Sequence, residues 1–189
     1  MRLLHSLLDN EAEIWSQQPH SDGCQDACYT CLKTYENQAL HGLLDWRLGL
    51  CYLRAFAQSD WSCGLDGDFS WGPLRDWPAQ AERLAQLTLQ LWGGEPEAMI
   101  RSTRRPGLEL VAFRLPLRGQ ASSPWVIVRH PLWAWGLQDG PLQEFRDELL
   151  QEGSTKTVLC WDSFNLSRRP GRSRQWMNAM GARRRSRRS

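Results

Sequence analysis

The chain has 189 residues, 41% of them hydrophobic and 23% charged, which is typical of one soluble domain that needs no disulfides for its core. No stretch approaches the ~20 uncharged apolar residues of a membrane helix, and acidic residues soon interrupt the apolar start, so we expect no membrane segment, no secretory signal and a cytoplasmic location. The net charge of +2 hides an asymmetry, because residues 1–167 contain 21 acidic and 14 basic residues and carry −7, whereas the last 22 residues carry +9.

The first predicted element is an amphipathic helix over residues 2–17, where leucines recur at helical spacing between polar residues. Pro19 and Gly23 then break the helix. They lead into the segment Gly23-Cys24-Gln25-Asp26-Ala27-Cys28-Tyr29-Thr30-Cys31, which we call the cysteine knuckle (residues 23–31).

The cysteine knuckle has the ligand spacing of a structural zinc site, because three and then two residues separate its cysteines. A tight turn can direct the sulfurs of Cys24, Cys28 and Cys31 to one tetrahedral Zn²⁺. The fourth ligand is open between His20, four residues before Cys24, and His41, ten residues after Cys31. A set of free, part-buried thiols is the alternative interpretation.

A second amphipathic helix is predicted from about residue 38 to residue 58. Its expected buried stripe is Leu40, Leu44, Leu48, Cys51 and Ala55. His41 and Asp45 are four residues apart and share a face of this helix. Asp45 therefore either orients His41 as a metal ligand or makes an ordinary hydrogen bond on the helix surface.

Two segments resemble one family. Residues 28–47 contain CYTCLKTYENQ and then HGLLDWR, and they resemble the pattern A-C-Y-x-C-L-x-x-Y-x-N-Q-x-x-H-x-x-L-D-R of the MrfA-like zinc-binding domain. Near the C-terminus, residues 158–170 read VLCWDSFNLSRRP and resemble the D-[ST]-F-N-L-x-R-R-P segment that closes many such proteins. Trp46 stands where the family usually has arginine, although Arg47 is adjacent.

This resemblance implies a zinc ion in the cysteine knuckle and a place beside a superfamily-2 DNA helicase, because the domain forms the C-terminus of many bacterial helicases of that class. The domain also occurs in DrmB-type antiphage defence proteins, so the resemblance implies either DNA repair or antiphage defence. The family usually supplies four cysteines, whereas only three are clustered in this sequence.

Residues 59–78 are rich in glycine, proline and tryptophan and predict a long ordered loop. Its tryptophans are expected to cover the edge of a core, and stacking on nucleobases is the alternative. Cys51 and Cys160 lie in a helical and a strand pattern, so core packing is their expected role. Cys63, in the loop, is left without an assigned role.

A third helix is predicted from residue 79 to about residue 92, after Pro78. Its expected apolar set is Ala81, Leu84, Leu87, Leu89 and Leu91. Strand patterns follow at residues 99–101, 108–115, 125–129 and 157–161, with a helix at residues 140–150 before the last strand. The sequence therefore predicts an α+β or α/β fold, in which N-terminal helices around the cysteine knuckle pack with a small layer of sheet and helix, followed by a basic tail.

We expect this chain not to be an enzyme. It contains neither a G-x-x-x-x-G-K-[ST] nor a G-x-G-x-x-G phosphate-binding motif, no G-x-S-x-G nucleophile motif, and no indication of a small-molecule substrate. His130 ends a strand pattern alone and is expected to be structural. The order of strands, helix and strand also occurs in a nuclease core that uses Asp and then Glu-x-Lys, although this sequence has no Glu-x-Lys. A degenerate or metal-dependent nuclease in this C-terminal layer is the alternative function.

We expect one domain over residues 1–165, made of a knuckle part at 1–58 and a helix-and-sheet part at 79–165, and a flexible basic tail over 166–189. DNA is the expected partner of the tail, because clustered guanidinium groups attract phosphates, and an incidental solvated terminus is the alternative. The candidate nucleic-acid-binding residues are Arg168, Arg169, Arg172, Arg174, Arg183, Arg184, Arg185, Arg187 and Arg188.

These expectations combine into one hypothesis about function. The chain is predicted to be a non-catalytic, zinc-binding accessory domain or subunit of a superfamily-2 helicase, with contacts to DNA and to the helicase. Tryptophan is enriched at the centres of protein interfaces. The expected docking contacts are Trp15, Trp46, Trp61, Trp71 and Trp77.

Overall fold

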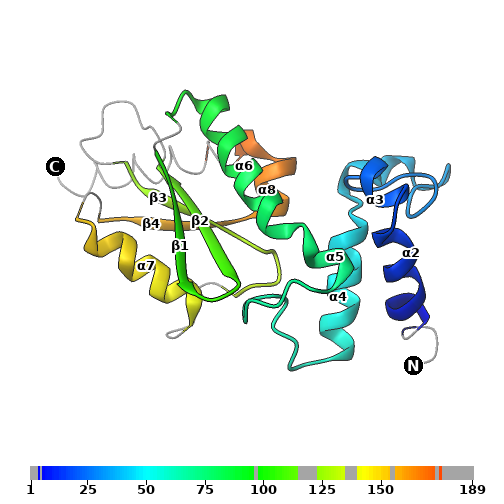
Figure 1. Ribbon diagram of the computed structural model, residues 1–189. Coiled ribbons are helices and arrows are strands. Elements are labelled where there is room, and N and C mark those ends of the chain that lie inside the picture. The colour runs from blue at the N-terminus through cyan, green and yellow to red at the C-terminus, as the bar shows by residue number, and fades with distance from the viewer. Residues whose placement is uncertain are drawn as a thin grey trace.

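Helices come first along the chain, and a four-stranded sheet with its own helices follows, which confirms the predicted α+β fold (Figure 1). The structure, a computed structural model, describes residues 4, 6–95, 98–114, 123–134, 140–153, 156–172 and 175. The helical segments are a π-helix η1 (Leu7–Glu11), α2 (Ala12–Ser16), α3 (His20–Gly23), a 3-10 helix η2 (Gln38–Leu43), α4 (Trp46–Ala57), α5 (Gly72–Arg75), α6 (Trp77–Trp92), α7 (Pro141–Gln151) and α8 (Ser163–Arg168). The strands are β1 (Met99–Arg105), β2 (Leu108–Arg114), β3 (Trp125–Arg129) and β4 (Val158–Asp162).

The sheet has the order β1-β2-β3-β4. The first three strands are antiparallel neighbours, and β4 is parallel to β3, so the connection between them crosses over through α7. Helices cover both faces of the sheet. Adjacent residues of a strand point to opposite faces, and adjacent residues of β1 contact different helices. The side chain of Arg101 pairs with Glu82 of α6, whereas Ser102 donates a hydrogen bond to Glu148 of α7 (3.3 Å).

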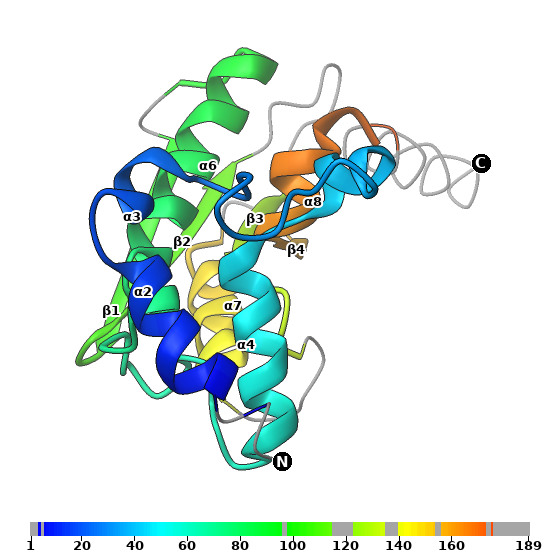
Figure 2. The same ribbon diagram turned by 90° about the vertical axis from the view of Figure 1, so that its right-hand side faces the viewer.

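The N-terminal part of the molecule consists of the short helices around the cysteine knuckle and α4, which lie beside the sheet layer (Figures 1 and 2). It has its own small apolar cluster, formed by Ala12, Cys24, Trp46 and Leu50. The larger cluster belongs to the sheet, α6 and α7. Trp71 packs against both clusters and thereby joins the two parts.

The predicted helix at residues 38–58 is two elements, which corrects the sequence analysis. η2 ends at Leu43, Leu44 is extended (φ −77°, ψ 133°), and α4 begins at Trp46. Asp45 is the N-cap, and its side chain accepts a hydrogen bond from the backbone N–H of Leu48 (3.0 Å). The buried residues of α4 are Trp46, Leu50 and Cys51, whereas Leu40 of the predicted stripe is exposed.

The predicted helix at residues 79–92 is confirmed as α6, which ends at Gly93 in the left-handed conformation (φ 73°). Leu87 and Leu91 were expected on its buried face and are more than half exposed. The buried residues of α6 are Trp77, Ala81, Ala85, Thr88, Leu89 and Trp92. Tryptophans at both ends of the helix displace the buried face from the position that the leucines alone indicate.

The tryptophans of the loop before α6 pack against other side chains of the same chain. The rings of Trp61 and Trp71 meet edge to face at 5.4 Å, and the guanidinium of Arg54 lies over both of them. Trp46 and Trp77 are buried, so these two residues, which were expected to dock a partner, hold this chain together. No helix in the described part of the chain is long and apolar enough to cross a membrane.

Candidate metal centre

Four side chains meet at the cysteine knuckle. The ligand atoms of His20, Cys24, Cys28 and Cys31 all lie within 4.8 Å of one another. The sulfur of Cys31 is 3.8 Å from the sulfurs of Cys24 and Cys28. Two thiolates bound at about 2.3 Å to one tetrahedral zinc lie about 3.8 Å apart. The four side chains therefore have the arrangement of a closed, four-ligand metal site.

The imidazole of His20 is oriented for coordination by the backbone before it. Nδ1 lies 2.8 Å from the carbonyl oxygen of Trp15, at the end of α2, and donates a proton to it. Nε2 then carries the free lone pair, and it is buried without a hydrogen-bond partner among the described residues. A metal ion at the three sulfurs would satisfy this nitrogen, in the way that a second partner commonly orients a ligating histidine.

His41, the other candidate for the fourth ligand, lies outside this group of four. Its Nε2 is 2.8 Å from Oδ1 of Asn37 and 3.0 Å from the carbonyl oxygen of Thr34, and its ring meets Tyr29 edge to face. Asn37 in turn donates to the carbonyl oxygen of Leu32 (2.8 Å). His41 and Asn37 therefore stabilise the turn that follows the cysteine knuckle. Asp45, which was considered as a residue that orients the His41 ring, caps α4.

The three thiols have different electrostatic surroundings. Burial, together with the adjacent thiols, raises the pKa of Cys24 to about 12. Burial also opposes the charged form of Cys28, but hydrogen bonds from Thr30 and from the neighbouring thiols lower the pKa of Cys28 to about 6. The backbone N–H of Cys28 donates a hydrogen bond to the sulfur of Cys31 (3.2 Å). A bound cation would deprotonate all three.

Two residues of α4 brace the cysteine knuckle through hydrogen bonds to its backbone. The indole N–H of Trp46 and the guanidinium of Arg47 both donate to the carbonyl oxygen of Cys24 (3.2 Å each). Arg47 also donates to the carbonyl oxygen of Gln25 (2.7 Å). The ring of Trp46 lies edge to face against that of His20, with centroids 5.4 Å apart. These contacts fix the backbone that presents the ligands.

A third brace comes from the other end of the chain. Arg168, in α8, pairs with Asp26 of the cysteine knuckle (3.0 Å) and donates to the carbonyl oxygen of Leu44 (3.1 Å). Figure 2 shows α8 beside the segment that precedes α4. Asp162 caps α8 by accepting from the backbone N–H of Asn165 (2.8 Å). The two motif segments that carry the family resemblance are thus in contact.

The structure places three of the nine candidate DNA-binding arginines. Arg168 belongs to the brace just described, and α8 carries the folded part past residue 165, with Leu166 buried. Arg169 and Arg172 are exposed. The remaining six lie outside the described residues: Arg174, Arg183, Arg184, Arg185, Arg187 and Arg188.

Comparison of the chain with models of protein families, with curated proteins and with solved structures gives no match. The family assignment therefore stays a prediction from the two motif segments. The geometry of the cysteine knuckle does not depend on the family assignment.

Exchange of each histidine tests the ligand set. His20→Ala is expected to lose the bound metal, because it removes the only imidazole that faces the sulfurs in the described part of the chain. His41→Ala is expected to keep one metal per chain, since its ring binds Asn37 and Thr34. Elemental analysis of both purified variants measures this difference. Metal loss in His41→Ala alone would assign the fourth ligand to His41 instead.

Proposed function

We propose that this chain is a zinc-binding accessory domain or subunit of a superfamily-2 DNA helicase, active in DNA repair or antiphage defence. One observation carries the proposal: Cys28 and Cys31 of the family-like segment meet Cys24 and His20 in a group of four potential metal ligands. The chemistry of ATP hydrolysis would then belong to the helicase, and this chain would contribute contacts to it and to DNA.

The donor set supports zinc as the metal. Three thiolates and one imidazole are the ligands of many structural zinc sites, and such sites are tetrahedral and closed to water. Cys24 is buried, and the sulfur–sulfur distances of 3.8 Å match a tetrahedral ion with thiolate bonds. Oxygen donors, which magnesium and calcium prefer, are absent from the group of four ligands.

A surface groove beside the cysteine knuckle supports a docking role. The groove has a volume of about 500 Å³, and residues of both motif segments line it. Its apolar lining includes Leu32, Leu43, Leu44, Leu48, Tyr52 and Phe164. Leu43 and Tyr52 are about half exposed, and exposed apolar patches of this kind commonly mark interaction surfaces.

The test is addition of this chain to a superfamily-2 helicase encoded beside it, with DNA-dependent ATP hydrolysis as the readout. The wild-type chain is expected to copurify with the helicase and to raise the rate. The double variant Leu43→Glu/Tyr52→Glu places two charges in the groove and should abolish both effects. Leu91→Glu is the control, because Leu91 is also an exposed apolar residue, on α6, but lies outside the groove. Equal stimulation by all three proteins would contradict docking through this groove.

The same preparation tests direct DNA contact. Binding is expected to be independent of DNA sequence and to weaken with salt, with a dissociation constant of about 10⁻⁴ to 10⁻⁶ M at physiological ionic strength. Arg172→Ala combined with deletion of residues 183–189 should lower the affinity and the salt dependence without disturbing the brace at Arg168. Cleavage of the DNA in the presence of magnesium would support the nuclease alternative instead.

A further inference from the structure

A second group of potential metal ligands lies in the main core, away from the cysteine knuckle. The ligand atoms of Cys51, Cys63 and His130 all lie within 4.8 Å of one another. The three residues come from separate parts of the chain: α4, the loop before α5, and the position directly after β3. Their exposed fractions are only 1%, 3% and 3%. Two sulfurs and an imidazole thus meet in a place where polar groups need partners.

We propose that Cys51, Cys63 and His130 form a second metal site, which takes a thiophilic divalent cation of the zinc class. A sulfur and a nitrogen bound to one tetrahedral zinc lie about 3.6 Å apart. The sulfur of Cys63 is 3.3 Å from Nδ1 and 3.9 Å from Nε2 of His130, two distances that lie on either side of this value.

The backbone at Cys63 adopts an unusual conformation that directs its sulfur inward. Cys63 has φ 54°, in the left-handed region that a residue with a side chain rarely adopts, and Gly64 follows with φ 80°. Among the described residues, Cys63 is the only non-glycine residue with a positive φ. A Cβ on Gly64 would lie 2.6 Å from the ring of Phe69, so this turn has no room for another side chain.

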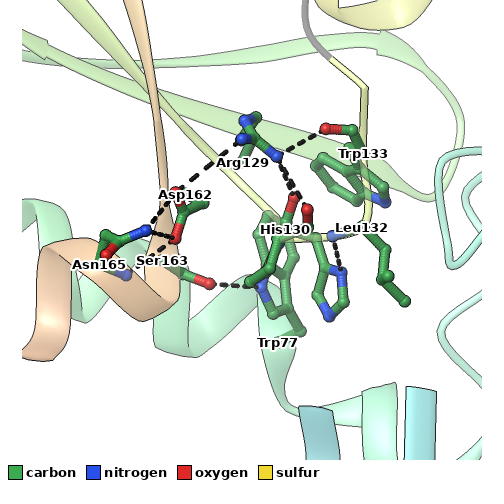
Figure 3. Close-up of polar contacts among 9 residues, drawn as sticks. Trp77, Arg129, His130, Leu132, Trp133, Asp162, Ser163 and Asn165 are labelled. Atoms are coloured by element: carbon green, nitrogen blue, oxygen red, sulfur yellow. Dashed lines mark hydrogen bonds and ion pairs between the residues drawn. The ribbon is translucent and has the colours of Figure 1, made fainter. Parts of the chain in front are cut away.

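Five hydrogen bonds fix the segment that carries His130. Arg129 donates to the carbonyl oxygens of His130, Pro131 and Trp133 at 3.1, 3.0 and 2.6 Å, and the backbone N–H of Leu132 lies 3.2 Å from Nδ1 of His130 (Figure 3). The indole N–H of Trp133 donates to the carbonyl oxygen of Cys63 (2.8 Å). The hydrogen bond from Trp133 therefore holds the two ligand-bearing segments together independently of the ligand side chains.

The electrostatics of the group favour a divalent ion. Two thiolates and a neutral imidazole cancel the charge of such a cation, so the buried complex carries no net charge and avoids the cost of burying an ion. The group supplies three protein ligands, so the fourth position of a tetrahedral ion would be taken by water.

The measurement is the number of metal ions per chain in protein purified under reducing conditions, obtained by elemental analysis and by titration of the demetallated chain with Co²⁺. We expect two ions per wild-type chain, and two equivalents of Co²⁺ that each develop thiolate–cobalt charge-transfer absorption. Cys51→Ala and His130→Asn should each retain one ion. Cys160→Ala is the matched control and should retain two, because Cys160 belongs to neither group.

The outcomes separate this site from the cysteine knuckle. If Cys31→Ser lowers the count by one but the wild-type chain holds a single ion, the cysteine knuckle stands and the second site is refuted. A wild-type count of two that Cys51→Ala and His130→Asn leave unchanged would also refute it. A disulfide between Cys51 and Cys63, detected as a loss of two hydrogens in the intact mass without reductant and as two thiols protected from alkylation, would overturn the proposal as well. If a variant fails to fold, the number of Co²⁺ equivalents that the wild-type chain binds still tests the second site.

Discussion

Cys31→Ser is expected to release the metal of the cysteine knuckle and to unfold the N-terminal part of the chain. Cys31 is the central ligand, since its sulfur lies 3.8 Å from both other sulfurs. Apolar burial alone holds this part weakly, because its cluster has only four buried residues in the described part of the chain. Structural zinc contributes apparent binding free energies of about 10–16 kcal/mol in small sites, so most of the local stability depends on it.

Thermal unfolding followed by tryptophan fluorescence measures this effect, and removal of metal from the wild-type chain with a chelator should reproduce it. Cys160→Ala is the control for loss of a sulfur, since Cys160 is a partly buried strand residue outside both groups of ligands. It should keep the metal and most of the stability. A melting curve of Cys31→Ser that coincides with that of the wild-type chain would argue against a structural metal in the cysteine knuckle.

Trp46→Ala is expected to have the second largest effect. Trp46 is 1% exposed, packs its ring against those of His20 and Trp15, and donates a hydrogen bond to the carbonyl oxygen of Cys24. Truncation of a buried tryptophan costs about 3–5 kcal/mol of unfolding free energy. Loss of a group that orients metal ligands commonly lowers metal affinity by about 10–100-fold, so both quantities should fall together.

Denaturant unfolding and competition with a fluorescent zinc chelator measure the two effects separately. The control is Phe56→Ala on the same helix, because Phe56 is 88% exposed and a surface substitution changes stability by only about ±0.5 kcal/mol. If Trp46→Ala loses stability but keeps its zinc affinity, the contacts of Trp46 support packing and have no part in orienting the ligands.

The sheet layer was predictable because its signals are local. Alternating or continuous apolar runs mark β2 and β3, Pro141 opens α7, and Gly93 ends α6. The break between η2 and α4 was missed because the apolar residues continue at helical spacing through it. The N-cap at Asp45 was the available signal, and the sequence analysis assigned Asp45 to the face of a continuous helix instead.

The candidate metal centre was predictable in part. Spacing alone identifies three clustered cysteines, but His20 and His41 differ only in what their rings contact after folding. The carbonyl oxygen of Trp15 orients one ring toward the sulfurs, and Asn37 binds the other. The second group could not be found from spacing, because Cys63 and His130 are 67 residues apart. Only the packing of α4 against the sheet layer brings its members together.

The brace between Arg168 and the cysteine knuckle has a consequence for the order of folding. Its hydrogen bond to Leu44 joins residues 124 positions apart in the chain. The four ligands span only residues 20–31, so they can gather around an ion early, whereas a contact of such long range carries a large loop-closure cost and forms late. A contact made after the transition state slows unfolding without speeding folding. Loss of the Arg168 contacts is therefore expected to speed the unfolding of the cysteine knuckle more than it slows its folding.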